Sequence, residues 1–200
     1  WSGTRELFTH RIILVSILLQ ALTLAALFGT LSSLQGIFEQ QFDRAGSFPL
    51  WFALIAITSM AGSLLNTRFV MTLGMRRIVR RTYVGMLGLT LLALVTLGSG
   101  VLQGGPGFAM QILWCIGLFS MMGLTMGNLN ALAMEPVGHI AGLAASVISS
   151  AATIGSVVLA IPVGLAFNGS STPLLVGVTL LIGLALLLAR LSLGEPHAAA

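Results

Sequence analysis

The sequence predicts an all-α membrane protein with six transmembrane helices. Hydrophobic residues make up 56% of the 200 residues, charged residues make up 7%, and the mean hydropathy is +1.03. A soluble domain carries about 25% charged residues, so this chain has too few to cover a surface that faces water. Six apolar runs also reach the roughly 20 residues that an α-helix needs to cross a bilayer.

The six runs form one domain over residues 1–200 and are joined by short connections. They lie at about residues 12–38, 49–73, 82–103, 108–133, 138–166 and 174–193. Of the nine arginines, only Arg44 lies in a connection at the opposite end of such a bundle from all the others. Because positively charged segments stay in the cytoplasm, this distribution predicts that both termini are cytoplasmic.

The runs fall into three compositional pairs. The first and fourth carry polar side chains, the second and fifth are rich in Gly, Ala and Ser, and the third and sixth are rich in Leu. Small residues such as Ala61, Gly62 and Ser63 let helix backbones approach closely. The same order of roles therefore occurs twice, in two sets that begin on opposite sides of the membrane. This is the arrangement of a three-plus-three inverted repeat.

Polar and soft side chains recur at helical spacing in the first and fourth runs, so each set shares one helix face. Met packs adaptably, and Trp offers a face for a cation, which suits a lipophilic or cationic ligand. Hydrogen bonding between helices is the alternative explanation. The candidate substrate-binding residues are Gln20, Thr23, Thr30, Gln111, Trp114, Leu118, Met121, Met122 and Thr125.

Charged residues at the ends of the runs are candidates for a cytoplasmic gate. Arg68 follows Asn66 by two residues, and Arg76 and Arg77 come soon after, so these arginines could pair with carboxylates or carbonyls. Glu135 precedes the fifth run. It could serve in the gate or in proton transfer, or it could cap a helix end, where a carboxylate suits the helix dipole. Topological anchoring is the alternative for the arginines.

The sequence offers no site for enzyme chemistry. His10, His139 and His197 lie at helix ends or in tails, so none reaches a serine or a haem at mid-membrane. No set of Cys, His and Asp has the spacing of a metal site. The arginines lie at helix ends, where topology explains them better than nucleic-acid binding. We therefore expect no catalytic residues, no cofactor, no metal and no nucleic-acid partner.

One stretch is similar to a known family. Residues 127–146 read GNLNALAMEPVGHIAGLAAS. This resembles the region between helices ten and eleven of Major Facilitator Superfamily (MFS) drug:proton antiporters, especially the Bcr/CflA-type branch. Residues 64–77, LLNTRFVMTLGMRR, resemble the signature after helix eight, and residues 7–11, LFTHR, resemble the start of helix seven. The resemblance covers nearly the whole chain, as the C-terminal six-helix half of a twelve-helix fold.

The resemblance implies a secondary transporter of the bacterial inner membrane. It would export small lipophilic drugs in exchange for protons by alternating access. The first and fourth helices would line the cavity, and the second and fifth would face an N-terminal six-helix half. That half would supply the main proton-coupling acid, because no run here has a carboxylate near its centre. Asn128 of the Gly-Asn pair joins the candidate gating residues. The alternatives are a self-contained six-helix membrane scaffold and a carrier made of two copies of this chain.

Overall fold

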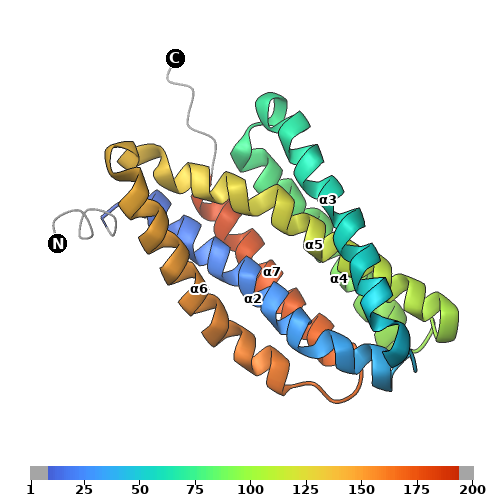
Figure 1. Ribbon diagram of the computed structural model, residues 1–200. Helices are drawn as coiled ribbons and strands as arrows, with labels where there is room; N and C mark the ends of the chain where they lie inside the picture. The colour runs from blue at the N-terminus through green and yellow to red at the C-terminus, as the bar shows by residue number, and fades with distance from the viewer. Residues whose placement is uncertain (1–8, 194–200) are drawn as a thin grey trace.

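The computed structural model describes residues 9–193, so Arg5, His197 and the first two of residues 7–11 lie outside the described part. Long helices make up nearly all of it (Figure 1). They are α2 (Arg11–Gln40), α3 (Phe48–Leu73), α4 (Met75–Gly98), α5 (Gly104–Met134), α6 (Ala141–Leu165) and α7 (Thr172–Ser192). Two short 3-10 helices are added, η1 (Ala45–Ser47) and η2 (Glu135–Ile140).

Within residues 9–193, five helical stretches are long and apolar enough to cross a membrane. The fourth, Gly104–Leu165, contains α5, η2 and α6. The chain reverses direction at η2, where Val137 has non-helical backbone angles (φ −129°, ψ 30°). Pro136 lies at the start of η2, as expected for a residue that cannot continue a helix. The protein is thus an all-α membrane protein.

The predicted run at 82–103 differs most from the structure, because α4 spans Met75–Gly98. Gly74, at φ 79° and ψ 149°, ends α3 and begins α4 without a loop between them. Arg76 and Arg77 therefore lie in the first turn of a helix, not in a connection. Hydropathy detects only the apolar part of a helix, whereas arginine itself is a good helix former.

The helices pack in a pattern that repeats between the two halves of the chain. α2 packs against α6 and α7, and α5 packs in the same way against α3 and α4. α2 also contacts α5, and α4 contacts α7, whereas α3 hardly touches α4 and α6 hardly touches α7. Exchanging α2, α3 and α4 for α5, α6 and α7 leaves this pattern unchanged. Figure 1 shows α6 alongside α2 and α3 across α5.

Small residues form the crossing of α3 and α5. A Cβ added to Gly123 would lie 2.7 Å from the backbone nitrogen of Ser63, and one added to Gly62 would overlap the backbone of Ser120. Gly127, by contrast, has nothing within 4 Å of its Cβ position. Only the first glycine of the Gly123-x-x-x-Gly127 pattern therefore serves the close helix packing that such patterns indicate.

The crossing of α2 and α6 is built in a related way. A Cβ on Gly29 would lie 2.8 Å from Val163 Cγ1, and one on Gly164 would lie 2.9 Å from Ser32 Oγ. Here the glycines meet side chains, whereas at the α3–α5 crossing they meet backbone. Both crossings bring helices from different halves of the chain together, so the two halves form one bundle.

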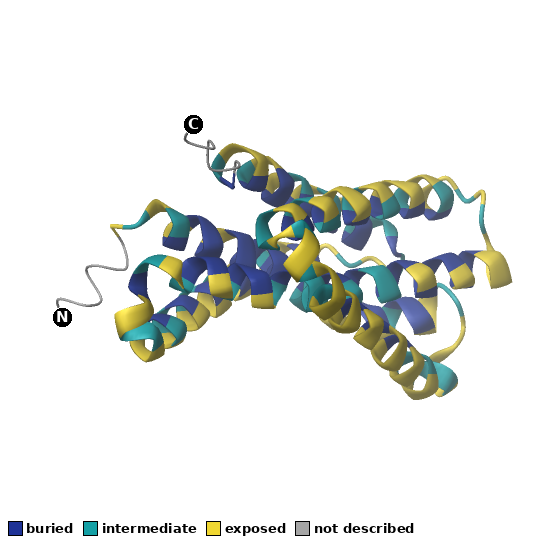
Figure 2. Ribbon diagram, turned by 90° about the horizontal axis from the view of Figure 1, so that it is seen from above, coloured by how far each residue is buried: buried dark blue, intermediate teal, exposed yellow. Residues whose placement is uncertain are grey.

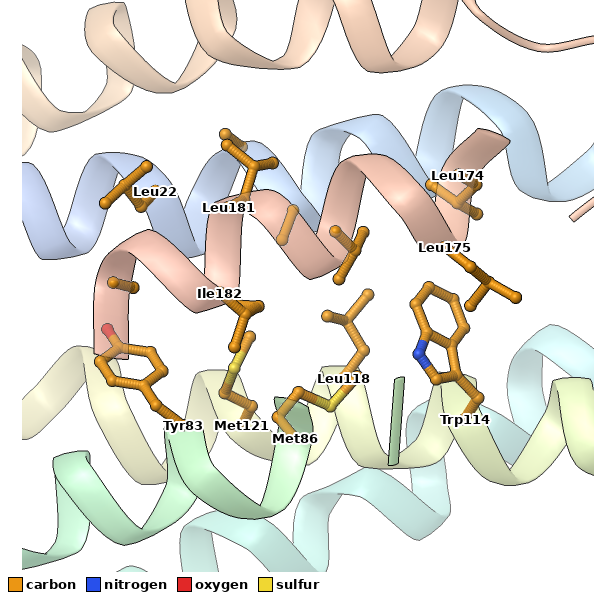
Figure 3. Close-up of a cluster of buried hydrophobic side chains, with 14 of the residues drawn as sticks. Leu22, Tyr83, Met86, Trp114, Leu118, Met121, Leu174, Leu175, Leu181 and Ile182 are labelled. Atoms are coloured by element: carbon orange, nitrogen blue, oxygen red, sulfur yellow. The ribbon is translucent and has the colours of Figure 1, made fainter. Parts of the chain in front are cut away.

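The interior of the bundle lies where α4, α5 and α7 meet. Met86 of α4, Leu118 of α5 and Ile182 of α7 belong to one buried cluster (Figure 3). Large apolar side chains cover the outside of the bundle, where exposed residues predominate (Figure 2). In water these side chains would form an unfavourable surface, whereas lipid tails solvate them. Examples are Ile57, Met60, Leu64, Val95, Ile154, Val158, Leu180 and Leu191.

We predict that Gly123→Ala destabilises the protein and that Gly127→Ala does not. The alanine at 123 forces α3 and α5 apart, which costs about 1–3 kcal/mol as other overpacked sites do. The alanine at 127 meets no neighbour and favours the helix by up to about 1 kcal/mol. The midpoint of thermal unfolding in detergent measures both changes. Equal midpoints for the two variants would contradict the close crossing.

Candidate functional site

Several predicted gating residues meet where α3 joins α4, close to the end of α5. Arg76 Nη2 lies 3.6 Å from Glu135 Oε2, and the two side chains are 31% and 47% exposed. We call Arg68, Gly74, Arg76 and Arg77 the arginine turn. It borders a surface hollow of about 490 Å³, which is lined by Leu73, Gly74, Met75, Arg76, Arg77, Leu132 and Glu135. The hollow thus lies between the first and second halves of the chain.

A pair of asparagines joins α3 to α5. Asn128 Nδ2 donates to Asn66 Oδ1 at 2.6 Å and to its own helix at Leu124 O, at 2.8 Å. Asn128 was expected at the gate, whereas Asn66 was not singled out. The sequence feature that could have identified Asn66 is its position two residues before Arg68. Arg68 itself is exposed on α3.

The strength of the Arg76–Glu135 pair follows from its exposure. Ion pairs that remain open to water contribute about 0–1 kcal/mol, because water and salt screen the charges. Such a pair adds little to the stability of the bundle. It can also separate and re-form at low cost, as a contact must if it opens and closes during a working cycle.

The predicted substrate stripe lies inside the bundle. Eight of its nine residues are buried, and Met122 is half-buried. Thr23 Oγ1 lies 2.7 Å from the Tyr83 hydroxyl, and Trp114 Nε1 donates to Thr90 Oγ1 at 3.1 Å. Tyr83 and Thr90 belong to α4, whose apolar run was described from the sequence only as rich in Leu. That description of α4 is incomplete, because the side of α4 that faces the interior carries the hydrogen-bond partners of two stripe residues.

These contacts give several stripe residues a role in holding helices together. Thr30 and Thr125 bond back to carbonyls of their own helices, Ala26 O and Met121 O, each at 2.7 Å. Leu118 and Met121 pack in the hydrophobic core. Contact with a substrate stays a prediction for all nine residues. It requires a second arrangement of α2 and α5 in which the stripe opens.

Ser171 joins three helix ends at the side of the membrane opposite the arginine turn. Its Oγ lies 2.7 Å from Gln41 Oε1 and 2.8 Å from Gln111 Oε1, and its backbone N–H donates to Gln41 Oε1 at 2.6 Å. One hydroxyl has one proton, so it can donate to only one of these oxygens. Rotating the Gln111 amide by 180° resolves this, because its NH₂ then donates to Ser171. Its oxygen would then accept from the Cys115 thiol, 3.6 Å from the present amide nitrogen.

Three buried polar atoms have no hydrogen-bond partner in the described part of the chain. They are Ser16 Oγ, Gln20 Nε2 and Ser33 Oγ, all on α2. Ser16 and Gln20 are one helical turn apart, and both are at most 1% exposed. A buried donor without a partner destabilises a fold by about 1–3 kcal/mol. This stretch of α2 therefore favours any state of the protein that supplies it with water or a polar ligand.

We expect Ser171→Ala to lower stability, with Ser170→Ala as the matched control. The first change leaves Gln41 and Gln111 without the group that joins them, which costs about 1–3 kcal/mol for buried polar groups. Ser170 N–H and Oγ both donate to Asn168 Oδ1 within the same turn. The midpoint of thermal unfolding measures both variants. If Ser170→Ala lowers it as much, the network does not hold the helix ends together.

Comparison of the chain with protein-family models, with curated proteins and with solved structures returned no match.

Proposed function

We propose that this chain is the C-terminal half of a secondary transporter that exports small lipophilic compounds by alternating access. The observation that carries the proposal is the repeating contact pattern, in which α2–α4 and α5–α7 pack in equivalent ways. Inverted repeats around a central site are a common plan of secondary transporters. The two central helices of the pattern, α2 and α5, are also those that carry the polar stripe.

Six membrane crossings and the proposed orientation fit the charges. If α5 and α6 are separate crossings, the chain crosses six times. The same end of the bundle then holds the start of α2, the α3–α4 joint, η2 and the end of α7 (Figure 1). Arg76 and Arg77 lie at this end, and Arg44 lies at the other. By the positive-inside rule, the arginine turn faces the cytoplasm of a bacterial inner membrane.

The Arg76–Glu135 pair serves as a gate contact in this proposal. It links the start of α4, in the first half of the chain, to the turn after α5, in the second half. Alternating access moves such repeats relative to each other. A weak, water-accessible pair suits this motion, because it favours one arrangement without blocking the other.

Proton coupling depends on a partner in this proposal. In the described part of the chain, the carboxylates are Glu39, Asp43 and Glu135, and all three lie at or beyond helix ends. A proton carrier needs an acid within the membrane. We therefore place the coupling acid in an N-terminal six-helix half that packs against this chain.

The exposed face of α6 favours such a protein partner. Ser146, Ser149, Ser150 and Thr153 are exposed there. Lipid tails cannot bond these hydroxyls, whereas a neighbouring helix can approach small residues closely. A second copy of this chain could cover the same face, so a homodimeric carrier is the second candidate.

Gln20→Leu tests the transport role directly. We predict that this variant unfolds at a higher temperature, because it removes an unpartnered buried amide, and that it exports less. Proton-driven efflux of ethidium from everted membrane vesicles, made with the complete gene product, measures export. Gln111→Leu is the control, because its amide has partners and its loss should lower stability. Normal efflux across several lipophilic drugs by a stabilised Gln20→Leu would exclude Gln20 from the substrate path.

Arg76→Ala tests the gate. We predict slower turnover with nearly unchanged substrate binding, since Arg76 pairs with Glu135 in the turn after α5 and does not belong to the polar stripe. Exchanging the two charges, Arg76→Glu with Glu135→Arg, should restore part of the turnover. Initial efflux rates and equilibrium drug binding separate the two effects. Weakened binding at normal turnover would count against the gate.

A further inference from the structure

A groove runs along the outside of the bundle between α3 and α4. These consecutive helices hardly touch, while α5 packs against both and forms the floor between them. Two hollows lie along α5 in this groove, one on the side of α3 and the other on the side of α4. The one near the α2–α3 connection has a volume of about 370 Å³ and is lined by residues that include Arg44, Trp51, Phe108, Ala109, Leu113 and Ile116. The other, near the start of α4, has about 260 Å³ and is lined by residues that include Thr82, Gly85, Leu89, Gly117 and Leu124.

The outer hollow is almost wholly apolar and opens away from α2. Leu113 at its floor is 54% exposed, and aromatic rings form its wall, with Trp51 and Phe108 in edge-to-face contact at 5.0 Å between centroids. Close to the membrane surface, an apolar hollow of this kind has the chemistry to hold a lipid tail. Leaving it empty would forfeit the dispersion contacts of its lining.

Arg44 closes the mouth of this hollow with a positive charge. Its Cζ lies 4.6 Å from the centroid of the Phe108 ring, and its backbone N–H donates to Phe38 O at 2.7 Å. Among residues 9–193, no carboxylate lies within ion-pair distance of Arg44. The guanidinium stacks on the ring with one face, so its edge N–H groups remain available to an oxyanion. Arginine binds phosphate through such paired N–H groups.

We propose that this groove binds one glycerophospholipid, with its phosphate on Arg44 and an acyl chain along α5 beside α3. Trp51 lies at the level where tryptophan meets the headgroup region of a bilayer. The protein thus offers what an amphiphilic ligand needs, an apolar groove for its acyl chain and a cation at the end of the groove for its phosphate. The site requires only that α3 and α4 cross the bilayer, so it stands independently of any transport activity.

Quenching of tryptophan fluorescence by brominated lipid tests the proposal on the complete protein in detergent. The probes are phosphatidylethanolamine with a dibrominated acyl chain, and a diacylglycerol with the same chain that lacks the phosphate. We expect the phospholipid to quench at concentrations about tenfold lower, as a charge-assisted hydrogen bond of about 1.4 kcal/mol would give. In a Trp1→Phe background, Trp51→Phe should remove most of the quenching by this chain, because Trp114, its remaining tryptophan, is fully buried.

Two variants separate the headgroup from the tail. Arg44→Gln should raise the half-quenching concentration of the phospholipid about tenfold, and Ala109→Leu should fill the hollow and reduce quenching by both probes. Arg190→Gln and Ala56→Leu are the controls, since both residues are exposed outside the two hollows. Equal quenching by the two probes, or no effect of Arg44→Gln, overturns the phosphate site. Unchanged quenching in Ala109→Leu overturns the groove. The comparison of probes uses the unmodified protein, so a misfolded variant leaves the proposal testable.

Discussion

Close backbone contact between small residues is the constraint on which this bundle depends. Between helices in a membrane the hydrophobic effect gives no net attraction, because lipid tails are as apolar as leucine. The α3–α5 crossing instead relies on Gly62 and Gly123, each of which lacks a Cβ where the other helix passes. At the α2–α6 crossing, Gly29 and Gly164 instead leave room for the side chains of Val163 and Ser32. These crossings set the positions of α3 and α6, and so determine which helix faces are left for lipid or for a protein partner.

Polar side chains add direction to this packing. The Thr23–Tyr83 and Trp114–Thr90 contacts both point from a central helix toward α4, and the Asn66–Asn128 contact joins α3 to α5. Each is a hydrogen bond in a place where water is scarce, which makes an unpaired group unfavourable. The contrast with Ser16 and Gln20, which have no partner on the same helix α2, is therefore informative. Along α2, the hydroxyls of Thr23 and Thr30 are hydrogen-bonded, whereas Ser16 Oγ, Gln20 Nε2 and Ser33 Oγ have no partner among the described residues.

Hydropathy predicted the apolar parts of the helices. It failed where part of a helix is polar. The apolar part of α4 was predicted, but its start at Met75 was not, because four arginines occupy its first two turns. Helical spacing correctly placed Thr23 and Trp114 on the inward faces of α2 and α5. It could not reveal Tyr83 as the partner of Thr23, since the two residues are 60 positions apart and are brought together by α5 and α7, which both pack against α2 and α4. The Arg76–Glu135 pair was foreseen only as a class of contact between arginines and carboxylates.

The joint at Gly74 has a mechanical consequence. Only this residue separates α3 from α4, and a single residue has two freely rotating backbone bonds. α3 and α4 therefore cannot slide past each other along their axes, because no slack exists between them. They can only change the angle and the torsion between them. Any widening of the space between α3 and α4 must therefore tilt the first turn of α4, and the arginines on it, by a corresponding amount.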